Sequence, residues 1–126
     1  MNIMNYHRLM NELKEIFPFE NYIKENSAGD PYKTVFSIAT QYLPKKSNVL
    51  DFGSGPCDKT AVVALLGHNC IAYDDLQDTW HKESDNTRKI LEFSKKIVVG
   101  NSSKTSNISG HPTANMAGHQ KSTKTI

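Results

Sequence analysis

An acid followed by two closely spaced glycines is the part of this sequence best suited to binding a small molecule. The run Asn48-Val49-Leu50-Asp51-Phe52 leads directly into Gly53-Ser54-Gly55-Pro56, so an expected strand turns abruptly into a loop. Glycine adopts positive φ and has no Cβ, which lets a ligand approach the backbone closely. Asp51 stands where the strand meets the loop, so its carboxylate is placed to contact that ligand.

Several ligand-binding loops begin in this way, and position 58 separates them. The dinucleotide fingerprint GxGxxG and the P-loop GxxxxGK[ST], each started at Gly53, both require glycine at position 58. The sequence has Asp58 there, although Lys59 and Thr60 would fit the P-loop. A carboxylate at this place would repel phosphate oxygens. The remaining pattern, DxGxG, therefore favours a ligand without phosphate.

A pair of acids follows the next expected strand. Residues 70–73 form a short apolar run, and Asp74 and Asp75 come directly after it. The interval from Asp51 to Asp74 is 74 − 51 = 23 residues, which accommodates one strand–helix–strand unit with parallel strands. Side chains at the carboxyl ends of neighbouring parallel strands converge on one crevice. A carboxylate there can accept two hydrogen bonds from the vicinal hydroxyls of a ribose.

These features together resemble the class I S-adenosylmethionine-dependent methyltransferases, whose first motif ends an apolar strand with an acid followed by GxGxG. Residues 49–55 match that motif, and Cys57 replaces its last glycine. The resemblance covers residues 30–99 and implies an α/β fold with a partial Rossmann-like parallel sheet. It implies that Asp74 holds the ribose of S-adenosylmethionine, with Asp75 as second choice, and that Asp51 lies near the cationic amino-acid end of the cofactor. The implied cofactor-binding residues are Asp51, Gly53, Ser54, Gly55, Asp74 and Asp75.

The resemblance implies transfer of a sulfonium methyl group to an acceptor that the sequence does not identify. This methyl group is already activated, so positioning carries most of the catalysis, and we assign no catalytic residue. His81 is a candidate base, but a lone histidine in a polar segment is more often simply solvated. Cys57, Cys70 and His68 have no recognisable zinc-ligand spacing, so no metal site is predicted.

A non-catalytic function stays open beside the enzymatic one. The same residues fit a βαβ nucleotide-binding module, a P-loop-like variant or an inactive gene fragment, in which the glycines only form a tight turn. Methyltransferases of this class have a larger sheet, whereas the strands at 48–52 and 70–73 are the secure ones here, and residues 97–99 are a marginal third. Apolar periodicity ends near Gly100, which suggests a truncated chain.

Helices are expected before and after the first strand in the sequence. Apolar residues recur at three- and four-residue intervals, and Asp30 and Asp58 are the expected caps of the second and third helices. Residues 74–84 form a long polar loop in this interpretation. The expected helices cover residues 5–17, 31–43, 58–66 and 85–96. The chain then divides into an N-terminal helical extension (1–29), the cofactor-binding portion (30–99) and a polar tail (100–126).

Composition excludes some partners. The 126 residues have room for one domain, and 15 basic against 13 acidic side chains give a net charge of +2, which predicts no nucleic-acid or membrane attraction. No stretch approaches the roughly 18 apolar residues of a membrane span, so a cytoplasmic protein is expected. Residues 100–126 contain no acidic or aromatic side chain, and we predict that this tail is disordered.

Overall fold

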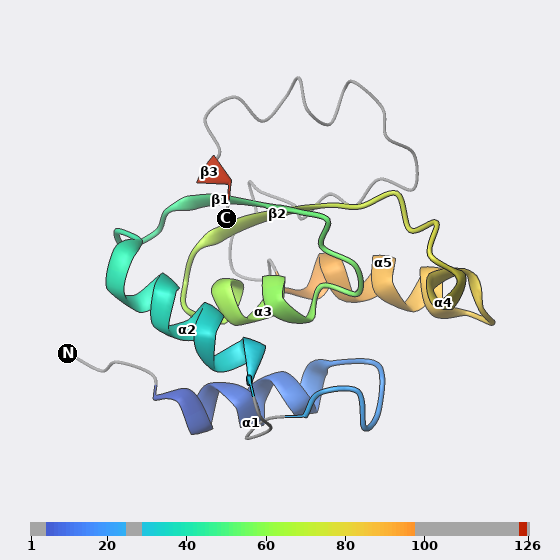
Figure 1. Cartoon of the computed structure of the whole chain (residues 1–126), viewed down its shortest axis with the longest axis horizontal. Coiled ribbons are helices and arrows are strands. Elements are labelled where there is room, and N and C mark those ends of the chain that lie inside the picture. Colours follow the sequence, from blue (N-terminus) through green and yellow to red (C-terminus); the bar gives the residue numbers. More distant parts are fainter. Residues whose placement is uncertain (1–4, 25–28, 98–123, 126) are drawn as a thin grey trace.

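The computed structural model describes residues 5–24, 29–97 and 124–125. The predicted mixture of helices and parallel sheet is confirmed (Figure 1). The elements are α1 (Tyr6–Ile16), α2 (Pro31–Tyr42), β1 (Asn48–Phe52), α3 (Asp58–Leu65), β2 (Asn69–Tyr73), α4 (Thr79–Lys82), α5 (Asn86–Lys96) and β3 (Lys124–Thr125).

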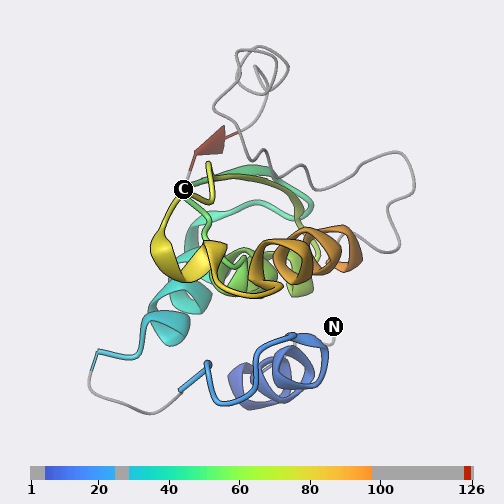
Figure 2. The ribbon, with the colours of Figure 1, turned by 90° about the vertical axis from the view of Figure 1, so that its right-hand side faces the viewer.

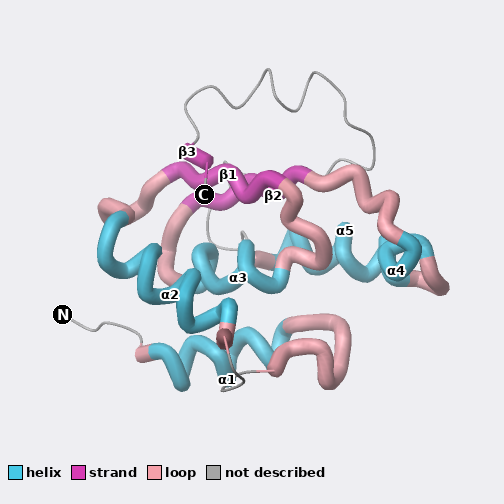
Figure 3. Tube along the Cα trace, viewed as in Figure 1, coloured by secondary structure: helices cyan, strands magenta, loops and turns pink. Residues whose placement is uncertain are grey.

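The sheet is built on the parallel pair β1 and β2. Their register runs from Asn48 opposite Asn69 to Phe52 opposite Tyr73. Figure 3 shows the two strands side by side. The short β3 pairs in parallel with the other edge of β1, so the strand order is β2-β1-β3. Because side chains alternate between the faces of a strand, Val49 and Cys70 are buried on the same face.

The described helices lie on one side of the sheet. Figures 1 and 2 show α3 and α5 next to the sheet and α1 farther away, beyond α3. The main core lies between these helices, and it includes α1, which the sequence suggested as an extension. Its largest fully buried side chains are Leu9, Met10, Leu13, Val62, Ile90 and Phe93. Burial of these side chains fixes α3 in place, and α3 begins at the glycine loop.

The helix starts show one success and one error of sequence-based prediction. Asp30 caps α2 as expected, because its Oδ1 accepts hydrogen bonds from the amides of Tyr32 (3.0 Å) and Lys33 (3.2 Å). The prediction that Asp58 caps α3 is wrong. The N-cap is Cys57, with a left-handed φ of 68°, and it makes no side-chain cap hydrogen bond. This turn moves Asp58 into the first turn of the helix, which frees its carboxylate for other contacts.

The second half differs from expectation at two places. The expected loop at 74–84 contains the short helix α4. Ile97 has helical geometry at the end of α5, so no strand begins there, and Val98 and Val99 lie outside the described residues. The predicted disordered tail also lies outside them, apart from the two residues of β3. Among the described residues, no helix has the length and apolar character required to cross a membrane.

Candidate functional site

A cavity of about 280 Å³ lies at the carboxyl ends of β1 and β2, where the glycine loop meets α3 and α4. Five of the six predicted site residues line it, namely Asp51, Gly53, Ser54, Gly55 and Asp74. Asp75 does not line it. The sheet therefore brings together two acids that stand 23 residues apart in the chain, as the sequence predicted.

The alternation of strand side chains explains why Asp74 and not Asp75 reaches the cavity. Cys70 and Ala72 are buried on the helix-facing side of β2, and Asp74 continues this two-residue period. Asp75 falls out of phase and is exposed, and its Oδ1 accepts a hydrogen bond from the Gln77 amide at 3.1 Å. The structure therefore gives the second-choice acid no place in this site.

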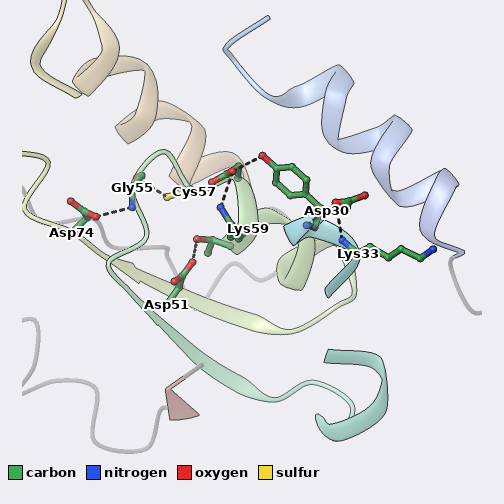
Figure 4. A network of polar contacts seen from close by, with 10 residues as sticks. Asp30, Lys33, Asp51, Gly55, Cys57, Lys59 and Asp74 are labelled. Carbon is green, nitrogen blue, oxygen red and sulfur yellow. Dashed lines mark hydrogen bonds and ion pairs between the residues drawn. The ribbon is translucent and has the colours of Figure 1, made fainter. Parts of the chain in front are cut away.

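Hydrogen bonds within the chain hold the glycine loop. Figure 4 shows the Asp74 carboxylate bonded to Gly55, whose amide donates to Oδ2 at 2.8 Å. The amides of Gly53 and Ser54 donate to the Tyr73 carbonyl at 2.8 and 3.1 Å. The three loop amides are thus satisfied by β2 and by the residue that follows it. A phosphate group would have to displace these bonds to use the loop as an anion cradle.

Asp51 is a half-buried carboxylate that faces α3. The Thr60 hydroxyl donates a hydrogen bond to its Oδ2, as the dashed line from Asp51 in Figure 4 indicates. Burial raises the pKa of Asp51; the Thr60 hydrogen bond opposes this rise, and the neighbouring charge of Asp58 adds to it. A cation bound beside Asp51 would relieve the cost of this buried negative charge.

Asp58 is the most deeply buried acid of the site, with 2% of its surface exposed. Its Oδ2 accepts a hydrogen bond from the Tyr32 hydroxyl at 2.7 Å and lies 3.5 Å from the Lys59 ammonium. With Asp51, Asp74 and Asp78 it gives the cavity wall four carboxylates, against the single lysine, Lys59. The arrangement favours a cationic or hydroxyl-bearing ligand over an anionic one.

His81 lies in the cavity wall, which corrects the expectation that it is solvated. It is buried, with 8% of its surface exposed, because α4 folds it back against the loop. A Cβ added to Gly55 would lie only 3.5 Å from the His81 Nε2. Its Nδ1 has no hydrogen-bond partner among the described residues. The polar sequence of 74–84 hid this role, since no periodicity pointed to the short helix α4.

Tyr22 is a wall residue that the sequence analysis missed. It comes from the segment after α1 and packs against Trp80, with ring centroids 5.3 Å apart. Phe19 also contacts Trp80, at 4.9 Å. The close spacing of Phe17, Phe19 and Tyr22 was the available signal for an aromatic cluster. Burial raises the pKa of Tyr22, and the charge of Asp58 adds to this rise.

Cys57 lies beside the cavity without the properties of a nucleophile. Burial raises the pKa of its thiol to about 12, so the helix N-terminus produces no reactive thiolate. Its left-handed φ instead shows that it occupies a glycine-like position in the loop. Among the described residues, no group of three or more potential metal ligands comes together.

Comparison of the chain with protein families, curated proteins and solved structures finds no match in any of the three.

Proposed function

We propose that this chain is the cofactor-binding portion of an S-adenosylmethionine-dependent methyltransferase, with β1, α3 and β2 as one βαβ unit of a Rossmann-like sheet. The observation that carries the proposal is the convergence of Asp51 and Asp74 on one cavity next to the glycine loop. In open parallel sheets, ligands bind at the carboxyl ends of the strands, which is where this cavity lies.

The donors and acceptors of the site suit the polar parts of this cofactor. Each Asp74 oxygen accepts one backbone hydrogen bond, from Gly55 or from Leu76, and a carboxylate has about four acceptor sites, so both oxygens can also accept from ribose hydroxyls. Asp51 and Asp58 provide negative charge for the ammonium and sulfonium groups. The cavity is slightly smaller than the roughly 300–1,000 Å³ of small-molecule sites, so it would enclose the charged part of the cofactor rather than all of it.

The loop chemistry argues against a phosphate-binding function. The amides of Gly53, Ser54 and Gly55 donate hydrogen bonds to acceptors within the chain. Asp58 adds a buried carboxylate to the cavity wall. A P-loop uses free backbone amides and a lysine around the phosphates. Lys59 instead lies next to Asp58, which partly neutralises it.

In this function the protein acts mainly by binding and orientation. The cofactor supplies an activated methyl group, and the chain must hold it so that an acceptor approaches in line. Asp51, Asp74 and the loop would fix the orientation. His81 contributes an imidazole to the wall, which could act as a general base if the acceptor must lose a proton.

Thermal unfolding of the full chain tests the proposal. S-adenosylmethionine at about 100 times its dissociation constant should stabilise the protein by about 2.7 kcal/mol, which is a shift of several degrees in Tm. ATP with Mg²⁺ should produce no comparable shift. The absence of any shift with S-adenosylmethionine, or a larger shift with ATP, would rule the proposal out.

A non-catalytic cofactor-binding module is the second candidate. It is favoured by one observation, namely that His81 is the one histidine that the described residues contribute to the cavity wall, and its Nδ1 is buried away from solvent. Incubation with methyl-labelled S-adenosylmethionine and a cell extract distinguishes the two. A labelled product that disappears with the Asp74→Ala variant indicates an enzyme, and binding without any product indicates the module.

A further inference from the structure

Asp58 occupies an unusual position for an acid. It stands in the first turn of α3, at the position where phosphate-binding loops need glycine, and its side chain is almost completely buried in the cavity wall. Tyr32 and Lys59 both approach Oδ2, whereas no hydrogen bond from the described residues reaches Oδ1. One oxygen is thus fixed by the protein, and the other accepts no hydrogen bond from the described residues.

A second polar side chain of the wall also has an atom without a partner. His81 is more than nine-tenths buried, lines the same cavity, and has an Nδ1 without a hydrogen bond in the described structure. This Nδ1 has almost no exposed surface, so a polar group of the wall is left unsatisfied at a cost in free energy. The histidine is an observation independent of the acids, and it places an unsatisfied polar side chain in the same wall.

The placement of Asp58 is supported from the N-terminal helices. Tyr32, which donates to Asp58, lies in the first turn of α2, and its amide donates to Asp30. Asp30 in turn accepts a hydrogen bond from the Tyr6 hydroxyl of α1 at 2.6 Å. These contacts hold the Asp58 carboxylate in one position in the wall.

The negative charge of Asp58 acts across the cavity. Beyond the effect of burial, it raises the pKa of both Asp51 and Tyr22, which come from different elements of the wall. The one lysine of the wall is about half exposed and lies next to Asp58 itself, so it cannot balance the other three acids. A positive charge on the ligand is what this wall lacks.

We propose that Asp58 determines the charge selectivity of the site, so that the positively charged sulfonium of S-adenosylmethionine is bound in preference to the neutral thioether of S-adenosylhomocysteine. This inference rests on the proposed function and adds to it the residue that distinguishes cofactor from product. The same charge would exclude nucleoside phosphates. Product release after methyl transfer would follow from loss of the positive charge.

Calorimetric titration of the full chain with the two ligands tests the inference. In the Asp58→Asn variant, which keeps the shape of the side chain and an acceptor for Tyr32, the affinity for S-adenosylmethionine should fall by about tenfold. The affinity for S-adenosylhomocysteine should change by less than about threefold, because no charge pair is lost. The preference for the charged ligand therefore decreases.

Two further variants serve as controls. Tyr32→Phe removes the hydrogen bond but keeps the charge, so the ratio of the two affinities should stay within about twofold of the wild-type ratio even if Tm falls. Asp75→Asn removes an equal charge outside the cavity and should leave both affinities unchanged.

The possible outcomes separate this inference from the proposed function. Equal weakening of both ligands in Asp58→Asn, or no weakening, overturns the charge selectivity while the proposed function stands. Wild-type protein that binds neither ligand overturns both. If Asp58→Asn does not fold, the wild-type affinities for the two ligands are compared directly; equal affinities, or a preference for S-adenosylhomocysteine, overturn the inference.

Discussion

The Asp74 carboxylate accepts a hydrogen bond from the Gly55 amide at 2.8 Å, so one acid links the end of β2 to the glycine loop after β1. Its other oxygen accepts from the Leu76 amide at 2.7 Å. The acid proposed to bind ribose therefore also determines the shape of the loop that faces the cofactor. Replacement of Asp74 must affect binding and local structure together, and the two effects have to be measured separately.

Replacement of Asp74 by alanine should abolish the Tm shift caused by S-adenosylmethionine. It should also lower the free energy of unfolding by about 1–3 kcal/mol, because two amides lose their acceptor. Thermal unfolding with and without ligand measures both effects. Asp75→Ala is the matched control, since Asp75 is exposed and outside the cavity; a variant at Asp75 that loses the shift while Asp74→Ala keeps it would reverse our assignment.

Alanine substitutions at Gly53 and Gly55 should have similar effects on stability but different effects on binding. Both glycines have positive φ, 78° and 54°, so each alanine should cost about 1–2 kcal/mol in backbone strain. A Cβ at Gly53 meets open space, whereas one at Gly55 reaches the His81 ring. Gly55→Ala should therefore lower the affinity for the cofactor by more than its loss of folding stability accounts for. Gly53→Ala should not. If titrations show that the two variants lose the same amount of affinity, the contact between position 55 and the His81 ring has no role in binding.

The affinity for S-adenosylmethionine should increase as the pH rises above about 4. Burial places the pKa of Asp51 above its ordinary value of 3.8, and the ionised form is the one that attracts a cation. In the window between 3.8 and the raised pKa the folded state holds more protons than the unfolded state, so Asp51 reduces stability as the pH rises through it. Asp51→Asn should remove both dependences. Affinities and Tm values across this range, measured for the wild type and the variant, provide the check.

Cys57 and Cys70 should react slowly with a thiol reagent in the folded protein at pH 8. Burial raises the pKa of each thiol to about 12, so very little thiolate is present. In guanidinium chloride both cysteines should react fully within the same time. Fast labelling of Cys57 without denaturant would show that the N-terminus of α3 opens readily, and fast labelling of Cys70 would show the same for β2.

Ligand binding should change the fluorescence of Trp80, the only tryptophan. Its ring packs against Tyr22, which lines the cavity, so a ligand that moves Tyr22 alters the surroundings of the indole. Titration with S-adenosylmethionine should give a saturable signal, which Trp80→Phe removes. Tyr22→Ala should reduce the affinity severalfold. If the signal saturates with an unchanged midpoint in Tyr22→Ala, Tyr22 does not contact the ligand.

Local sequence patterns predicted the elements that carry the site. The apolar run before Asp51 predicted β1, and the two-residue period of β2 accounts for the orientation of Asp74 toward the cavity. These features depend on neighbouring residues only, so they are readable without a structure. The same reading failed at Asp58 and at 74–84, where a left-handed residue and a four-residue helix leave no periodic signal.

The sequence alone determined that two acids and a glycine loop end neighbouring parallel strands, because strand period and turn chemistry are local properties of the chain. Only the tertiary structure decided that Asp58, Tyr22 and His81 complete the wall. Packing of α1, α3 and α4 around the loop brings these side chains together from distant positions, and that packing depends on the burial of the whole core rather than on any one segment.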